Sequence, residues 1–96
     1  MSAARVALGL VELHLPDVES LKGKRHVLKG LKEKVRARFQ VSVAEVDHQD
    51  LWQRAALGVA VVSGESHQVT EMLDSVRRLV EGTFGAELID WQEQHV

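Results

Sequence analysis

The spacing of hydrophobic residues changes along the chain between the two periods that distinguish strands from helices. Residues 6–15 are rich in Val and Leu and end at PDVES, which is typical of a strand. From residue 21 the apolar positions fall at helical spacing: Val27, Leu28, Leu31, Val35 and Phe39. The pattern therefore predicts an amphipathic helix over residues 21–39, although two glycines inside it lower its intrinsic propensity.

The rest of the chain repeats this change of period. A short strand is predicted at 41–46 and a longer one at 52–63. Ser66 is the predicted N-cap of a second helix, which ends within the glycine-flanked segment 82–85, and a last strand covers 86–93. The order strand, helix, strand, strand, helix, strand predicts an α+β fold in a single domain, residues 1–96. We expect a ferredoxin-like βαββαβ sandwich, with a four-stranded antiparallel sheet and both helices on one face.

The two strands expected at the centre of this sheet are apolar on both sides. In residues 6–15, Val6, Leu8 and Leu10 alternate with other apolar residues, and residues 52–63 behave alike. A two-layer fold normally leaves one sheet face polar. Small Ala and Gly side chains tolerate partial exposure and provide one explanation. The interpretation we favour is a homo-oligomer in which a second subunit covers the open face.

Composition adds limits on chemistry and location. The 96 residues include no Cys, which excludes disulfides and thiolate catalysis and favours the cytoplasm, and no apolar run is long enough to cross a membrane. Asn is also absent, as in thermophile-like compositions or under a GC-rich genome. The spacing of the five histidines fits no metal motif, and no serine lies beside a placed base. We therefore expect no cofactor, no metal and no enzymatic activity.

The positive charge is concentrated in one segment. Residues 22–38 contain eight basic residues and one acid, a formal charge of +7, whereas the rest of the chain carries −9. A continuous stripe is predicted at helical spacings of three and four: Lys22, Arg25, Lys29, Lys32 and Arg36. Lys24, Lys34 and Arg38 are expected at other exposed angles of the same helix. Such a surface suits nucleic-acid phosphates. The alternative is a solvated helix face that pairs with acids from elsewhere, such as Asp17 and Glu19.

Three segments together resemble the YlxP-like family of small bacterial proteins, domain of unknown function 503: SLKGKRHVLKGL (20–31), VSVAEV (41–46) and WQRAALGVAVVS (52–63). The resemblance implies a ferredoxin-like fold and no established activity. Family members are often encoded near translation-initiation and ribosome-maturation factors, which implies a link to RNA or the ribosome. The matching positions are Ser20, Leu21, Lys22, Lys24, Arg25, Glu45, Trp52, Gln53 and Arg54. Within this set we expect Trp52 to cover the sheet edge and Arg54 to pair with Glu45 across the hairpin.

The sequence thus predicts a non-enzymatic cytoplasmic domain that contacts RNA or a ribosomal assembly. The candidate nucleic-acid-binding residues are Lys22, Lys24, Arg25, Lys29, Lys32 and Arg36. The alternative is an oligomeric interaction scaffold whose basic helix contacts an acidic protein surface, such as that of a partner subunit. A third class, a small enzyme or ligand-binding domain at a subunit interface, occurs on this fold but has no motif here.

Overall fold

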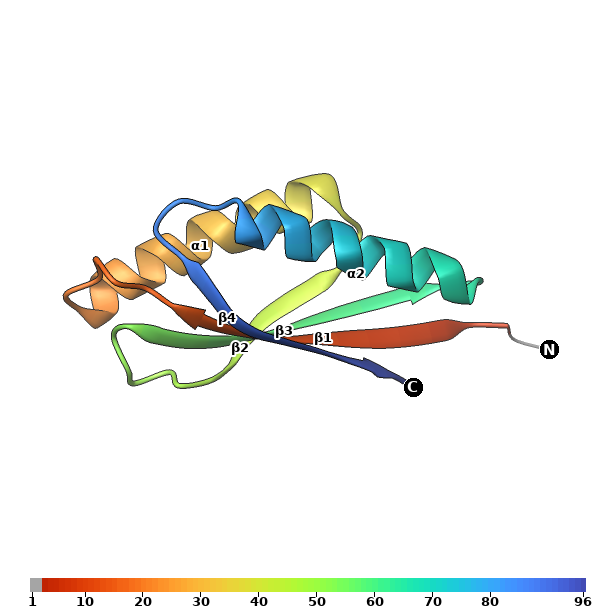
Figure 1. The fold of residues 1–96 in the computed structure, drawn as a ribbon, viewed down its shortest axis with the longest axis horizontal. Coiled ribbons are helices and arrows are strands. Elements are labelled where there is room, and N and C mark those ends of the chain that lie inside the picture. Colours follow the sequence, from red (N-terminus) through yellow and green to blue (C-terminus); the bar gives the residue numbers. More distant parts are fainter. Residues whose placement is uncertain (1–2) are drawn as a thin grey trace.

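The structure, a computed structural model, describes residues 3–96 and has the predicted order of elements. The strands are β1 (Arg5–His14), β2 (Ser42–Asp47), β3 (Arg54–Ser63) and β4 (Glu87–His95), and the helices are α1 (Leu21–Arg38) and α2 (Ser66–Glu81). The sheet has the order β2-β3-β1-β4, and all its pairings are antiparallel. Both helices cover the same face (Figure 1). The ferredoxin-like α+β fold is therefore confirmed.

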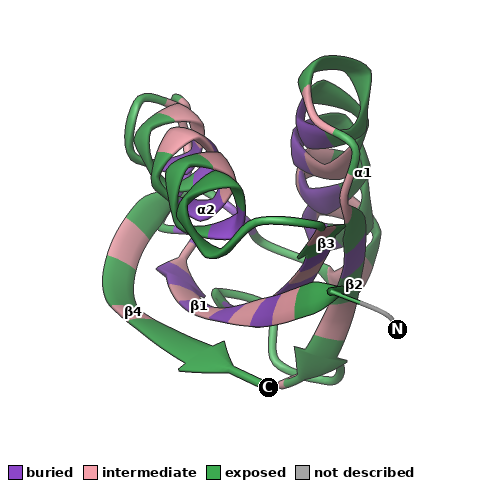
Figure 2. Cartoon of the chain, turned by 90° about the vertical axis from the view of Figure 1, so that its right-hand side faces the viewer, coloured by how far each residue is buried: buried purple, intermediate pink, exposed green. Residues whose placement is uncertain are grey.

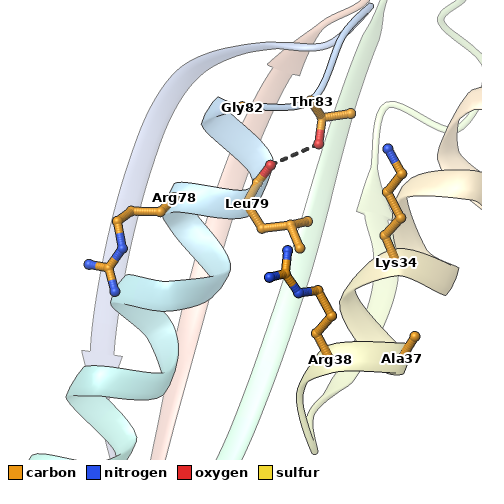
Figure 3. A pocket seen from close by; sticks show the side chains of 7 residues that line it. All are labelled: Lys34, Ala37, Arg38, Arg78, Leu79, Gly82 and Thr83. Atoms are coloured by element: carbon orange, nitrogen blue, oxygen red, sulfur yellow. Dashed lines mark hydrogen bonds between the residues drawn. The ribbon is translucent and has the colours of Figure 1, made fainter.

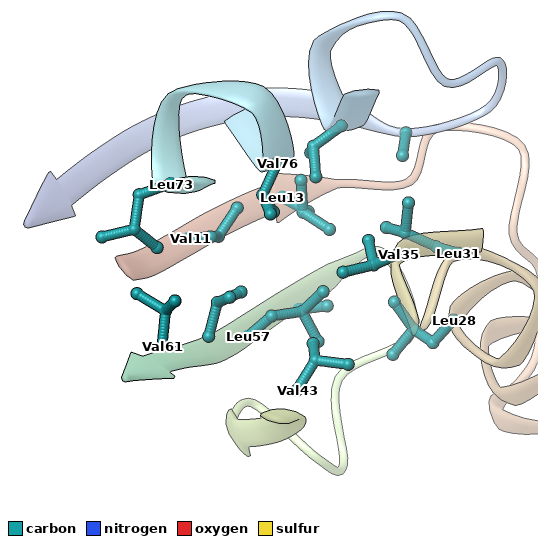
Figure 4. Packing of buried hydrophobic residues seen from close by; sticks show 14 of the residues in the cluster. Val11, Leu13, Leu28, Leu31, Val35, Val43, Leu57, Val61, Leu73 and Val76 are labelled. Carbon is teal, nitrogen blue, oxygen red and sulfur yellow. The ribbon is translucent and has the colours of Figure 1, made fainter. Parts of the chain in front are cut away.

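One hydrophobic core lies between the sheet and the two helices. Its centre is built from apolar residues of β1, β3 and both helices, including Leu13, Leu31, Leu57 and Leu73, each no more than 2% exposed. Figure 4 shows these side chains converging from the two layers. The outward sides of the helices are exposed (Figure 2). The apolar residues at helical spacing in the sequence are thus the ones that the helices turn toward the core.

The two helix starts differ in how their free N–H groups are satisfied. The Ser20 hydroxyl accepts a hydrogen bond from the Gly23 N–H at 3.0 Å, as an N-cap should. The prediction of Ser66 as N-cap of α2 is wrong, because Glu65 occupies that position without a side-chain cap. Ser66 is the first helical residue, and its hydroxyl instead accepts a hydrogen bond from Arg5 Nε at 3.2 Å. The Ser66 hydroxyl thus binds a residue of β1 that is distant in sequence and does not cap the helix.

The open face of the sheet is apolar at its centre. Val6, Leu8 and Leu10 of β1 are only half-buried there, whereas the residues between them face the core. Val62, the register partner of Val6, is 66% exposed, and Val46 of β2 is 53% exposed. Gly58 leaves room for Val46, since a Cβ at residue 58 would lie 3.0 Å from Val46 Cγ1. Hydrophobic side chains from three strands therefore lie on a face that residues 3–96 leave uncovered.

Candidate nucleic-acid interface

Helix geometry places the basic stripe on one flank of α1. Successive residues are about 100° apart, and the buried positions of α1 are Lys24, Leu28, Leu31 and Val35. On this projection the centre of the stripe lies roughly 110° from the centre of the buried side. Arg36 shows which neighbour this flank faces, because its guanidinium donates a hydrogen bond to the Val43 carbonyl of β2 at 2.7 Å. The stripe thus lies on the side of α1 nearest the edge strand β2.

Four cations of the stripe have side chains without a partner among the described residues. Lys22, Arg25 and Lys29 are exposed and Lys32 is partly exposed. Within residues 3–96, none of these four side chains takes part in an ion pair or a hydrogen bond, and neither Asp17 nor Glu19 pairs with them. Pairing with acids, the alternative explanation of the stripe, is therefore not found in this part of the chain. Four unpaired cations on one flank make a surface of strong positive potential.

Lys24 does not belong to this surface. Its side chain was expected to be exposed, but the residue is 1% exposed and faces the core. The ammonium nitrogen lies 2.7 Å from Glu45 Oε2 and also donates a hydrogen bond to the His48 carbonyl. The sequence carried a signal for this position, because Lys24 precedes Leu28 by four residues and Leu31 by seven. Because lysine is a charged residue, it was expected on the exposed surface although its position falls on the apolar side of the helix.

The ion pair continues into a chain of polar contacts around the end of β2. His48 adopts φ +60°, a conformation that favours glycine, and its carbonyl also accepts the Leu51 N–H at 3.0 Å. Its imidazole Nε2 lies 3.1 Å from Glu12 Oε1. Arg54 donates a hydrogen bond to the other Glu12 oxygen at 3.1 Å. His48 thus links the Lys24–Glu45 pair, on the helix side of the sheet, to Glu12 and Arg54.

The predicted pairing of Arg54 with Glu45 is therefore wrong. Glu45 lies opposite Leu57, and the pairing of β2 with β3 ends at Asp47 and Ala56. Arg54 lies beyond the end of β2, so its acidic neighbour comes from β1 instead. Trp52 precedes β3 and is 54% exposed, and its expected place over the sheet edge stays a prediction.

Several residues of the family signature have structural roles. Gln53 donates two hydrogen bonds, to the carbonyls of Pro16 at 3.2 Å and Val18 at 3.1 Å, and so ties the β2–β3 loop to the β1–α1 loop. Together with the Ser20 cap and the contacts of Lys24, Glu45 and Arg54, this contact gives five of the nine signature residues a structural role without a ligand. Of the other four members, Lys22, Arg25 and Trp52 are exposed and Leu21 is partly buried.

Other kinds of site find little support in the described part of the chain. No group of three or more His, Asp or Glu side chains there is placed to hold a metal ion. No helix among residues 3–96 is long and apolar enough to span a bilayer. A hollow of about 300 Å³ on the open sheet face includes Leu10, Glu12 and Asp90 in its lining. Its Glu12 is already held by His48 and Arg54.

Comparison with known proteins agrees with this architecture. The family model described as protein of unknown function DUF503 matches residues 6–93. The uncharacterized protein YlxP of Bacillus subtilis (strain 168) is 40% identical over 65 residues, which is 68% of this chain and 71% of YlxP. Among solved structures, the de novo designed protein Foldit4 superposes with a TM-score of 0.54 at 11% identity, covering 94% of this chain and 96% of Foldit4. That likeness shows the fold alone. Because the family model covers nearly the whole chain, the protein belongs to the DUF503 family of YlxP-like proteins.

Proposed function

We propose that this protein is a non-enzymatic cytoplasmic domain that binds RNA, free or within a ribosomal assembly, through the outer flank of α1. The observation that carries the proposal is the unpaired state of Lys22, Arg25, Lys29 and Lys32. Like charges at these spacings destabilise a helix modestly. A phosphate backbone relieves that repulsion and gains further free energy by releasing its own counterions.

The two other candidate cations contribute differently. Arg36 holds the Val43 carbonyl of β2, and the remaining donors of its guanidinium are available to a phosphate at the end of the stripe. Lys24 is buried in its pair with Glu45 and is excluded from the proposed interface.

The proposed mode of binding is to the RNA backbone. RNA-recognition motifs stack bases on aromatic residues of the open sheet face. Here Trp91 is the register partner of the core residue Val11, and its ring packs close to Gly9 while Arg77 lies over it. This tryptophan is therefore engaged on the helix side and is not available for base stacking on the open sheet face. Binding would then rest on contacts between the stripe and RNA phosphates, with strong salt dependence and little sequence preference.

Cross-linking and RNA capture from native cell lysate test the proposal. We expect the variant with Lys22, Arg25, Lys29 and Lys32 changed to Gln to recover at least about tenfold less RNA than wild type, because four phosphate contacts are lost. A matched pair controls for net charge: Lys29→Gln with Lys32→Gln should lower recovery, and Arg5→Gln with Arg77→Gln should not. Equal recovery by all variants, with the fold intact, contradicts the proposal. Selective competition by ribosomal RNA over heparin would separate RNA recognition from general affinity for polyanions.

A second candidate function is an oligomeric scaffold, and the open sheet face favours it. Val62 and Val46 are more than half exposed there, beside the half-buried Val6, Leu8 and Leu10. A second copy of the chain would bury these side chains. In the scaffold alternative, α1 contacts an acidic protein surface, such as that of the partner subunit, in place of RNA. Capture of acidic protein without RNA by wild type, lost in the four-cation variant, would favour the scaffold.

A further inference from the structure

A second cationic surface lies on the opposite flank of α1, in the groove between the two helices. The C-terminal halves of α1 and α2 lie side by side around a hollow of about 570 Å³. Its lining residues are Lys34, Ala37, Arg38, Arg78, Leu79, Gly82 and Thr83. Three are cations and none is an acid. Figure 3 shows Lys34 and Arg38 extending from α1 toward Leu79 and Thr83, whereas Arg78 extends away from them.

The fold does not use the charges of Lys34 and Arg38. Cations near a helix C-terminus often bind its free carbonyls. Here the chain itself satisfies these groups in α2: the Thr83 hydroxyl donates to the Leu79 carbonyl at 2.8 Å, and the Thr83 N–H donates to Val80 at 3.1 Å. In α1, the Phe39 N–H donates to the Val35 carbonyl. Within residues 3–96, neither Lys34 nor Arg38 makes a side-chain hydrogen bond or an ion pair.

An exposed aromatic residue directly follows the last residue that lines this groove. Phe84 directly follows Thr83, so the two Cα atoms are about 3.8 Å apart. At 96% exposed, Phe84 is the most exposed large hydrophobic residue in the described chain. Its backbone is held close to α2, because both hydrogen bonds of Thr83 anchor the preceding residue. The loop therefore presents an uncovered aromatic side chain one residue beyond the cationic groove.

An unpaired nucleotide fits this combination. Proteins that bind single strands pair cationic grooves, which follow the phosphates, with aromatic rings on which bases stack. The bases of a duplex are stacked inside the helix and are not available to such a ring. We propose that the α1–α2 groove binds an unpaired RNA segment, with phosphates at Lys34 and Arg38 and a base stacked on Phe84. This inference rests on the proposed function and adds a substrate class, single-stranded RNA, and a second contact surface.

Binding of two RNA probes to the full chain tests this site. The probes are a short uridine oligonucleotide and a blunt RNA duplex, followed by fluorescence anisotropy at one salt concentration. We expect Phe84→Ala to weaken oligonucleotide binding about 5- to 150-fold, the range for loss of one stacked base, and to leave duplex binding unchanged. Phe84→Tyr, which keeps the ring, should bind like wild type. Because Phe84 is almost fully exposed, these variants should fold normally.

Charge variants separate this site from the stripe. Lys34→Gln with Arg38→Gln should weaken the oligonucleotide more than the duplex, whereas Lys29→Gln with Lys32→Gln should weaken the duplex. If Phe84→Ala binds the oligonucleotide like wild type while the Lys29 and Lys32 pair loses RNA, the groove site is wrong and the proposed function stands. If wild type binds neither probe, both are wrong. If Phe84→Ala loses binding to anionic phosphatidylserine vesicles and not to the oligonucleotide, the groove is a membrane contact and the inference is overturned.

Discussion

Lys24 joins three parts of the molecule through one ammonium group. It rises from α1, contacts Glu45 of β2 and binds the His48 carbonyl in the loop after that strand. Glu45 Oε2 is buried and has no hydrogen bond, so the ion pair with Lys24 is its charge compensation. The same ammonium helps to hold His48 at φ +60°, a conformation that is unfavourable for a side chain with a Cβ. A basic residue in a basic segment thus acts as a core residue.

Replacing Lys24 should therefore affect stability and not RNA binding. Lys24→Met keeps most of the packing volume but leaves Glu45, whose side chain is 21% exposed, without a cation. We expect the free energy of unfolding to fall by about 2–4 kcal/mol. The lower end of this range applies if water reaching the partly exposed Glu45 carboxylate compensates for part of the lost ion pair. Urea denaturation measures the change. Lys29→Met, on the exposed flank of the same helix, should stay within about 0.5 kcal/mol of wild type.

The double variant Lys24→Met with Glu45→Met completes the test. Removing both charges removes the unpaired carboxylate, so much of the lost stability should return. Equal stability of Lys24→Met and Lys29→Met would contradict the buried ion pair. A loss of RNA capture in a folded Lys24→Met protein would return Lys24 to the candidate interface.

At the scale of elements, α1 has three distinct sides. One side packs on the core, one carries the stripe beside β2, and one faces α2 with Lys34 and Arg38. Gly30 lies on the exposed surface, and a Cβ added there would meet nothing within 4 Å. No contact explains this glycine, so its effect on α1 is the general conformational cost of glycine in a helix.

Gly30→Ala should therefore stabilise the protein. We expect the free energy of unfolding to rise by about 0.5–1 kcal/mol, measured by urea denaturation. Gly23→Ala is the matched control, because its Cβ would lie 3.3 Å from the Ser20 hydroxyl that caps the helix. The control should gain less stability or lose some. A Gly30→Ala variant no more stable than wild type would contradict the prediction.

The sequence predicted elements better than their ends and their contacts. Apolar spacing is a local property, and it was enough for the six elements and the fold. The start of β3 is set by Gln53, which binds Pro16 and Val18 some 35–37 residues away, and no local pattern contains that contact. The partner of Arg54 depends on where the pairing of β2 ends. Phe84 was not singled out, because one aromatic in a loop carries no sign of its exposure.

At the scale of the molecule, the two layers present different surfaces. The helices carry the free cations, and the open side of the sheet carries Val46, Val62 and the half-buried residues of β1. A sheet of four strands with ten residues in β1 covers on the order of 600 Å², from about 33 Å along the strands and 19 Å across them. That area approaches the roughly 800 Å² that each partner contributes to a stable interface. We therefore expect a second copy to pack sheet to sheet on this face.

Such a dimer would leave both helical layers outward, and each dimer would carry two stripes. We expect wild type to sediment as a dimer at high micromolar concentration. Val62→Lys should shift it to monomer, because each added charge would be buried in the interface without a partner. Val62 is 66% exposed in the single chain, so this variant should still fold. Thr70→Lys on the exposed side of α2 controls for charge and should remain a dimer.

The same variant connects assembly to function. RNA long enough to contact both subunits should bind the dimer with more than twice the affinity that a single stripe has for RNA, since the second contact is intramolecular. Val62→Lys should then weaken binding to long RNA while leaving a short probe unaffected. Wild type that sediments as a monomer at high concentration would contradict the sheet-to-sheet dimer. The half-buried face would then reflect only the small Ala and Gly side chains of β3, and each stripe would act alone.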